Sequence, residues 1–190
     1  MRIGVFGGSF DPVHLGHLIA ARAARAHLEL DQVRLVPARE QPFKAGKHGA
    51  PATERLALLE AAVAGDPTLV ADRCELDRSG PSYTVDTLRH LRGVFPADEL
   101  FFLIGADAAR QLPQWREAET LPALATIVVL TRPGEAPPPG VGSVCVEVPA
   151  VEISASDIRT RCGRGDNIRD LVPDAVRALI AARGLYAERD

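Results

Sequence analysis

Short runs of apolar residues alternate along this chain with longer stretches in which apolar residues recur every three or four positions. A short unbroken run is typical of a β-strand covered on both faces, and the wider spacing is typical of an amphipathic helix. The runs predict strands at 3–6, 33–36, 69–74, 100–104, 126–130 and 144–148. The spacing predicts helices at 14–30, 53–64 and 84–94, a helical stretch containing Trp115, and a mainly helical tail from Ser154. Prolines and glycines predict loops at 37–50 and 132–142.

Strands that alternate with helices predict an α/β fold, because each helix returns the chain to the start of the next parallel strand. We therefore expect a Rossmann-like, doubly wound, mostly parallel sheet with helices on both faces and a helical carboxyl-terminal segment at about 154–190. A chain of 190 residues suits one core, so we expect a single domain spanning 1–190. In such folds the ligand lies beyond the carboxyl ends of the strands, so candidate site residues should directly follow strands.

The composition excludes several classes of partner. Apolar residues make up 46% and charged residues 25% of the chain, as in globular proteins rather than membrane or disordered ones. The net charge of -3 disfavours broad binding to nucleic acid or to an acidic membrane, so we expect neither partner. Cys74, Cys145 and Cys162 are widely separated and odd in number, which predicts free thiols rather than disulfides or a zinc site. With an amino terminus that lacks a targeting segment, this predicts a cytoplasmic protein.

The most informative segment, Gly7–His17, reads GGSFDPVHLGH and lies between the first predicted strand and the first predicted helix. Glycines allow a ligand to approach the backbone, and the free amides and dipole of a helix start favour a phosphate. His14 and His17 are three residues apart and so share a helix face, while Gly16 has no side chain to obstruct a ligand. For a lone histidine, a glycine turn with ordinary histidines is the commoner case, but the whole segment predicts an anion site with two imidazoles.

This segment resembles the signature of the nucleotidylyltransferase family with the HxGH motif, and GSFDPVHLGH is similar to the motif of its nicotinate mononucleotide branch. The resemblance implies an enzyme that transfers the adenylyl group of ATP to nicotinate mononucleotide and releases pyrophosphate, in the biosynthesis of NAD. It implies that His14 and His17 are catalytic, binding the phosphates and stabilising the charge of the departing pyrophosphate. It also implies ATP contacts along the turn, at Gly7, Gly8, Ser9, Phe10 and Gly16. A phosphate monoester has a second pKa of about 6, so the mononucleotide is an ionised nucleophile that needs no general base.

A second segment, Ile153–Arg159, reads ISASDIR and resembles the family's ISSTxIR motif. The resemblance implies that Ile153, Ser154 and Ser156 bind ATP and that Arg159 is a catalytic contact of its phosphates. Ala155 replaces a serine of the motif, which leaves that position without a hydroxyl. Without the resemblance, the same residues would be a helix N-cap followed by an exposed arginine.

Lys44 and Lys47 are the only lysines of the chain, and both lie in the predicted loop 37–50. A solvated loop lysine is the common case, but an ammonium on a long loop can also close over a triphosphate. The loop is similar to the family's proline- and lysine-containing loop, which favours Lys44 as the catalytic cation.

Two further elements follow predicted strands. Gly105 would admit a ligand, and the carboxylate of Asp107 could accept hydrogen bonds from ribose hydroxyls or could simply cap a helix. The sequence around them resembles the family's GxD element, which implies contacts with adenosine. Arg132 follows the next strand and is expected near the adenine of ATP.

The pyridine end is indicated by two segments, 80–88 and 112–115, that are similar to those of the nicotinate branch. The resemblance implies that the mononucleotide contacts Ser82, Tyr83, Thr84 and Trp115. Backbone amides at a helix start near Thr84 suit the nicotinate carboxylate, and the indole of Trp115 could stack on the pyridine ring. The alternative is a capped helix and a core tryptophan.

Other readings remain open on the sequence alone. A nicotinamide mononucleotide or phosphopantetheine adenylyltransferase would share the histidine chemistry, and a nucleotide-binding module without catalysis would share the fold. We expect Mg2+ to arrive on the phosphates of ATP, because no acidic cluster has the spacing of a metal cage. The sequence leaves open a homo-oligomer and the extent to which the loop 37–50 closes.

Overall fold

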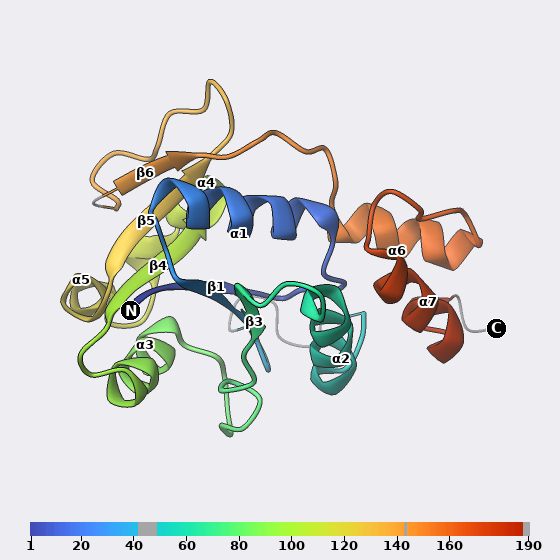
Figure 1. Ribbon diagram of the computed structural model, residues 1–190, viewed down its shortest axis with the longest axis horizontal. Helices are drawn as coiled ribbons and strands as arrows, with labels where there is room; N and C mark the ends of the chain where they lie inside the picture. The colour runs from blue at the N-terminus through green and yellow to red at the C-terminus, as the bar shows by residue number, and fades with distance from the viewer. Residues whose placement is uncertain (42–48, 143, 188–190) are drawn as a thin grey trace.

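A single sheet of parallel strands, in the order β3-β2-β1-β4-β5-β6, forms the centre of the molecule (Figure 1). The computed structural model describes residues 1–41, 49–142 and 144–187. Within them the strands are β1 (Arg2–Gly8), β2 (Gln32–Pro37), β3 (Leu69–Ala71), β4 (Glu99–Gly105), β5 (Thr126–Thr131) and β6 (Val144–Glu147). The direction of chain progression reverses between β1 and β4, which pair directly. A reversal of this kind leaves a crevice at the carboxyl ends of the strands, where ligands bind.

Helices cover both faces of the sheet, and Figure 1 shows α1 on the opposite side from α3 and α5. The helices are α1 (Leu15–His27), α2 (Ala52–Val63), α3 (Thr84–Val94), α4 (Ala106–Ala109), α5 (Leu121–Leu124), α6 (Ala155–Arg164) and α7 (Asp174–Arg183). Buried side chains of α1, α2, α6 and α7 share one core with the sheet, and those of α3, α4 and α5 share the other. Two cores on two faces confirm the predicted doubly wound α/β class.

The apolar run of β4 explains why periodicity identified the strands. Phe101 and Leu103 belong to one core, whereas Phe102 and Ile104 belong to the other. Each of these four side chains is at most 6% exposed. A strand buried on both faces has no polar side to interrupt the run.

Two predicted elements end earlier than expected. The helix predicted at 14–30 ends at His27, because Glu29 adopts a positive φ of 51° and turns Leu30 into the core. The strand predicted at 69–74 ends at Ala71, because the side chain of Asp72 accepts a hydrogen bond from the backbone of Cys74 at 2.9 Å. An aspartate that bonds the backbone two residues further on favours a turn over an extended strand.

The prediction of one helical stretch around Trp115 is wrong. The segment consists of α4, two short 3-10 turns (Leu112–Gln114 and Ala118–Thr120) and α5, and Trp115 lies outside all of them with ψ at 154°. Glu117 has a positive φ of 51°, which a continuous helix does not allow. The break places Trp115 where its ring faces the crevice rather than a helical core.

The predicted helical tail is confirmed. Both of its helices end at a glycine in the left-handed region, α6 at Gly165 with φ 73° and α7 at Gly184 with φ 58°. A left-handed residue closes a helix by redirecting the backbone, and glycine adopts this conformation without strain. No helix in the described part of the chain has the length and apolar character needed to cross a membrane.

Candidate active site

The predicted phosphate-binding turn lies at the carboxyl end of β1, as expected. Gly7 is exposed and Gly8 half-buried, and a side chain added at Gly8 would lie 3.2 Å from the ring of Phe10. Phe10 itself is 1% exposed and adopts a φ of 45°. Its ring belongs to the core, so only its backbone can meet ATP, which sequence reasoning did not distinguish. Ser9, the next predicted contact, donates from its hydroxyl to the side chain of Gln41 at 2.8 Å.

The two imidazoles of the motif stack on each other instead of standing apart in solvent. The ring centroids of His14 and His17 are 3.7 Å apart with 22° between the planes, and His17 also contacts the edge of Phe10 at 4.9 Å. Burial lowers the pKa of His14 to about 4. Burial, and then the proximity of His14, lowers the pKa of His17 well below its ordinary value. Both rings are therefore neutral at neutral pH.

Hydrogen bonding fixes the tautomer of one ring. The backbone amide of His14 donates to Nδ1 of His17 at 3.3 Å, so Nδ1 is an acceptor and the proton of the neutral ring sits on Nε2. Nδ1 of His14 is buried without a hydrogen-bond partner in the described part of the chain. A methyl group on Gly16 would lie 3.1 Å from that nitrogen, so glycine is needed to leave it uncrowded.

The second motif lies beside the first. Ser154 caps α6 as predicted, because its Oγ accepts from the amide of Asp157 at 3.1 Å, and Oγ of Ser156 lies 3.1 Å from the same atom. Arg159 is not the exposed arginine of the alternative reading. Its Nη1 donates to the carbonyl of Asp11 at 2.7 Å, joining two motifs that are 148 residues apart in sequence. Ile153 is partly buried against the core that α6 shares with the sheet.

The remaining predicted ATP contacts follow β4 and β5. Gly105 ends β4 and is the N-cap of α4, so Asp107 is not the cap that the alternative reading proposed. Asp107 is exposed and pairs with Arg110, and Arg132 is exposed directly after β5. Because β1, β4 and β5 are adjacent and parallel, these residues lie with the glycine turn at the carboxyl ends of the strands. Lys44 and Lys47 lie outside the described residues.

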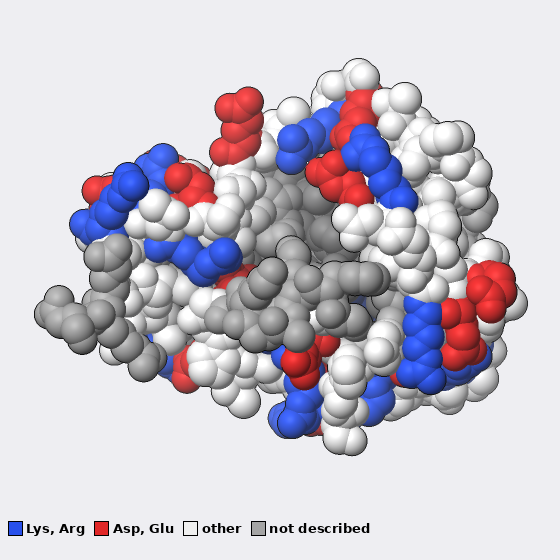
Figure 2. Space-filling view, turned by 180° about the vertical axis from the view of Figure 1, so that it is seen from behind, with Lys and Arg blue, Asp and Glu red and all other residues white. Residues whose placement is uncertain are grey.

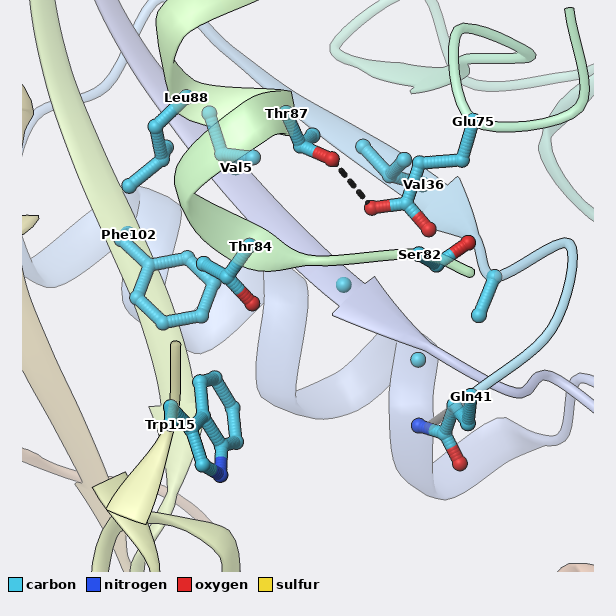
Figure 3. Close-up of a pocket in the computed structure, with 13 residues that line it drawn as sticks. Val5, Val36, Gln41, Glu75, Ser82, Thr84, Thr87, Leu88, Phe102 and Trp115 are labelled. Carbon is cyan, nitrogen blue, oxygen red and sulfur yellow. Dashed lines mark hydrogen bonds between the residues drawn. The ribbon is translucent and has the colours of Figure 1, made fainter. Parts of the chain in front are cut away.

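Two cavities that share Ser82, Thr84 and Trp115 as lining residues lie at this end of the sheet. The smaller, about 70 Å³, reaches from Gly7 and Gly8 to Thr84 and Trp115. Figure 3 shows Thr84 and Trp115 among the residues that line it. The larger, about 640 Å³, extends outward past Trp115 to Asp107. Figure 2 shows a hollow on the face seen from behind, with charged side chains of both signs along its border. A volume of several hundred cubic ångströms suits a nucleotide-sized ligand.

The predicted mononucleotide residues line these cavities. Tyr83 is the N-cap of α3 and Thr84 its first residue, so the free amides of α3 start at the cavity wall. Ser82 holds the wall in place, since its amide donates to the carbonyl of Glu40 and its Oγ accepts from the amide of Arg39, both at 2.9 Å. Trp115 lines both cavities and also contacts Phe102 edge-on with ring centroids 6.3 Å apart. It is therefore a wall residue with one side on the core.

Sequence reasoning missed several wall residues. Glu75 is buried and lines the smaller cavity, and the hydroxyl of Thr87 donates to it at 2.6 Å (Figure 3). Burial raises the pKa of Glu75. Arg116 lines the larger cavity and lies 4.8 Å above the ring of Tyr83. No motif marked these residues, and only proximity in the fold identifies them.

The fold and the site define a nucleotidyltransferase of the Cytidylyltransferase-like class, whose family model matches residues 5–161. A protein of Thermus thermophilus, named "Probable nicotinate-nucleotide adenylyltransferase", is 52% identical over 98% of this chain and 100% of its own length. A protein of the same name from Geobacillus thermodenitrificans is 45% identical over 99% of this chain and 87% of its length. The chain belongs to the nicotinate-nucleotide adenylyltransferase family.

Comparison with solved structures supports the same fold. The Plasmodium falciparum nicotinic acid mononucleotide adenylyltransferase complexed with NaAD aligns with a TM-score of 0.78 over 97% of both chains. The structure of that enzyme complexed with APC aligns with a TM-score of 0.76 over 97% of this chain and 96% of the other. The sequence identities are only 17% and 16%, so these alignments establish the architecture.

Proposed function

We propose that this chain transfers the adenylyl group of ATP to nicotinate mononucleotide, forming nicotinate adenine dinucleotide and pyrophosphate in the biosynthesis of NAD. The observation that carries the proposal is the continuity of the crevice. Gly7 and Gly8 of the phosphate-binding turn line the same cavity as Thr84 and Trp115. A phosphate bound at one end and an aromatic ring bound at the other would therefore lie close enough to belong to a single dinucleotide product, as the transfer requires.

The reaction is a direct displacement at the α-phosphorus. A phosphate oxygen of the mononucleotide bonds to that phosphorus while its bond to the oxygen bridging to the β-phosphate breaks, and the electron pair leaves with pyrophosphate. The nucleophile is already ionised, so the protein's tasks are positioning and charge stabilisation. His17 suits this role, since its Nε2–H is a fixed neutral donor, and His14 offers the second imidazole.

The other predicted residues take roles by position. The β- and γ-phosphates would be bound at the start of α6 by Ser154, Ser156 and Arg159, together with Lys44. The backbone around Ile153 would lie next to these phosphates. The turn residues 7–10 and Gly16 would admit the triphosphate. Asp107 would accept from the ribose, with Gly105 and Arg132 near adenosine. Tyr83 and Thr84 at the start of α3 would present amides to the nicotinate carboxylate, Ser82 would border them with its amide bonded to Glu40, and Trp115 would stack on the pyridine ring.

Mg2+ would arrive with ATP and neutralise charge on its phosphates. The described residues contain no group of three histidine, cysteine or acidic side chains placed to hold a metal. The cysteines Cys74, Cys145 and Cys162 are free, which fits a cytoplasmic enzyme. We also treat residues 1–190 as one functional unit, because α6 contributes Arg159 to the turn after β1.

A substrate panel tests the proposal. Pyrophosphate release is measured with Mg2+ and ATP together with nicotinate mononucleotide, nicotinamide mononucleotide or phosphopantetheine. We expect turnover with the nicotinate compound to exceed that with the other two by at least about tenfold, since the amides of α3 favour a carboxylate. Preference for another acceptor would contradict the substrate assignment. Binding of ATP without turnover of any acceptor would contradict catalysis and favour a nucleotide-binding module.

A further inference from the structure

The turn after β1 is held by a buried carboxylate that belongs to none of the predicted site residues. Asp11 is 3% exposed. Its Oδ2 accepts from the amide of Gly49 at 2.6 Å, and its Oδ1 accepts from the amide of Ala50 at 3.1 Å. Its backbone carbonyl accepts from Arg159, as described above. One residue of the turn thus fixes the end of the loop after β2 and the arginine of α6.

The carboxyl-terminal tail reaches the same carboxylate. The hydroxyl of Tyr186 donates to Oδ1 of Asp11 at 2.9 Å, across a separation of 175 residues. Burial, and then the negative charge of Asp11, raises the pKa of Tyr186, so its hydroxyl remains a protonated donor. A hydrogen bond from a neutral donor to a charged acceptor is stronger than one between neutral groups.

The ring of Tyr186 also forms a wall around this contact. A methyl group placed on Gly49 would lie 2.6 Å from Cδ of Arg159 and 3.0 Å from Cδ1 of Tyr186. The aliphatic part of the arginine and the tyrosine ring therefore close over Gly49 together. The ring therefore borders the space of the arginine side chain, which is 32% exposed.

We propose that Tyr186 is a positioning residue for the ATP phosphates: its hydroxyl orients Asp11, whose carbonyl holds Arg159, and its ring lies beside Arg159 against Gly49. This inference rests on the phosphate role proposed for Arg159. Tyr186 acts through Asp11 and Arg159 and touches no reacting atom. The tail beyond α7 thereby becomes part of the nucleotide site, although no motif in it suggested a role beyond structure.

The tail has separate anchors that serve only stability. Val176 and Ile180 of α7 are buried in the core, and Arg183 forms an exposed ion pair with Glu54 of α2. Removing the hydroxyl of Tyr186 leaves all of these contacts in place. If Tyr186 were purely structural, removing its hydroxyl would have the same effect on activity as removing the ion pair of Arg183. If Tyr186 is a positioning residue, removing its hydroxyl should weaken ATP binding specifically.

The test compares the full-length chain with Tyr186→Phe and with the matched control Arg183→Gln from the same tail. Measurements are kcat, both KM values, the Kd of Mg-ATP by calorimetry and the melting temperature. For Tyr186→Phe we expect the Kd and KM for ATP to rise about fivefold and kcat to fall by a similar factor, with KM for nicotinate mononucleotide within about twofold. Tyr186→Ala, which also removes the ring, should show a larger loss with the same selectivity. Arg183→Gln should leave all three kinetic constants within about twofold.

Several outcomes would overturn the inference. One is a Tyr186→Phe variant whose Kd for Mg-ATP and kcat stay within about twofold of the parent chain. Another is a parallel change in both KM values, or an equal change in Arg183→Gln, since either would show a general structural effect. The calorimetric Kd needs no turnover, so it decides the role of Tyr186 even if the parent chain fails to use nicotinate mononucleotide, which would overturn the proposed function alone.

Discussion

The two ends of the crevice are built in different ways. At the phosphate end, partly buried hydrogen bonds join the turn after β1 to the loop after β2, to α6 and to the carboxyl-terminal tail. At the pyridine end, Tyr83, Trp115 and Arg116 line an open cavity, where Arg116 lies over the ring of Tyr83 and Trp115 contacts Phe102 of the core edge-on. The first end is fixed mainly by directional bonds between segments, whereas at the second end the hydrogen bonds of Ser82 support a surface defined mainly by the shape of its rings.

This difference matches the chemistry proposed for each end. Stabilising charge in a transition state requires donors that are already in place, because reorientation during the reaction costs free energy. Recognition of a planar ring requires a flat apolar surface and a few polar groups at its edge. Mutations at the phosphate end should therefore affect stability and kcat, and mutations at the pyridine end should affect the apparent affinity for one substrate.

The largest effect, a loss of folding stability, is expected when Arg55 is replaced. This residue lies in α2 and is 0% exposed. Its guanidinium donates to the carbonyls of Ser9 at 2.6 Å, Ala38 at 2.7 Å and Ala50 at 3.2 Å, and so joins the ends of β1 and β2 to α2. Arg55→Met would leave these buried carbonyls without donors, so we expect the free energy of unfolding to fall by about 3–5 kcal/mol. Urea unfolding measures the change.

The control for Arg55 is Arg92→Met. Arg92 also donates to backbone carbonyls, those of Asp98 at 2.6 Å and Leu124 at 2.8 Å, but it lies near the opposite end of the sheet. Arg92→Met should lower the free energy of unfolding without changing the Kd of Mg-ATP. Arg55→Met should weaken ATP binding even at temperatures where this variant is folded. Equal effects of the two variants on ATP binding would show that the phosphate end has no special dependence on its buried bonds.

The sequence predicted the framework of this site better than its interior. All six strands were predicted, because each is an apolar run, and the residues that follow β1, β4 and β5 could be brought to one edge by topology alone. The direction of a side chain could not be predicted in this way. Phe10 points into the core and the two imidazoles stack, and both facts depend on packing between elements.

Contacts between distant segments were also invisible in the sequence. Arg55, Glu75 and Tyr186 belong to no motif that pointed to a role, and each has a partner far along the chain, at separations of 46, 12 and 175 residues. Nothing local distinguishes a buried arginine that bonds carbonyls from a surface arginine of an amphipathic helix. The error around Trp115 has the same origin, since a left-handed residue at Glu117 is stabilised by tertiary contacts and not by its own type.

The next largest effect, a loss of turnover, is expected when His17 is replaced. His17→Ala would remove the donor proposed for the departing phosphate oxygens, so kcat should fall about 100-fold while KM for nicotinate mononucleotide changes little. Steady-state pyrophosphate release measures both constants. His27→Ala, at the exposed last residue of the same helix, is the control and should retain full activity.

The pH profile sharpens this result. Burial lowers the pKa of both motif histidines below the ordinary 6.5, so neither ring should gain a proton as pH falls from about 8 toward 6.5. Activity should not fall in that interval on account of the imidazoles. Near-normal kcat in His17→Ala would remove this residue from the mechanism, and the phosphate end would then depend on its backbone and arginine alone.

The smallest of these effects is expected when Trp115 is replaced, and it should be confined to the affinity for one substrate. The indole packs against the core with one side, including an edge contact of 6.3 Å with Phe102, but it lines both cavities, so its loss should disturb the ring site more than the core. Trp115→Ala should raise KM for nicotinate mononucleotide about tenfold and leave the Kd of Mg-ATP within about twofold, whereas Trp115→Phe, which keeps an aromatic face, should recover most of the loss. If Trp115→Ala instead lowered the melting temperature and weakened both substrates alike, the tryptophan would be a core residue. The contrast between an end fixed by bonds and an end fixed by shape would then fail at the pyridine site.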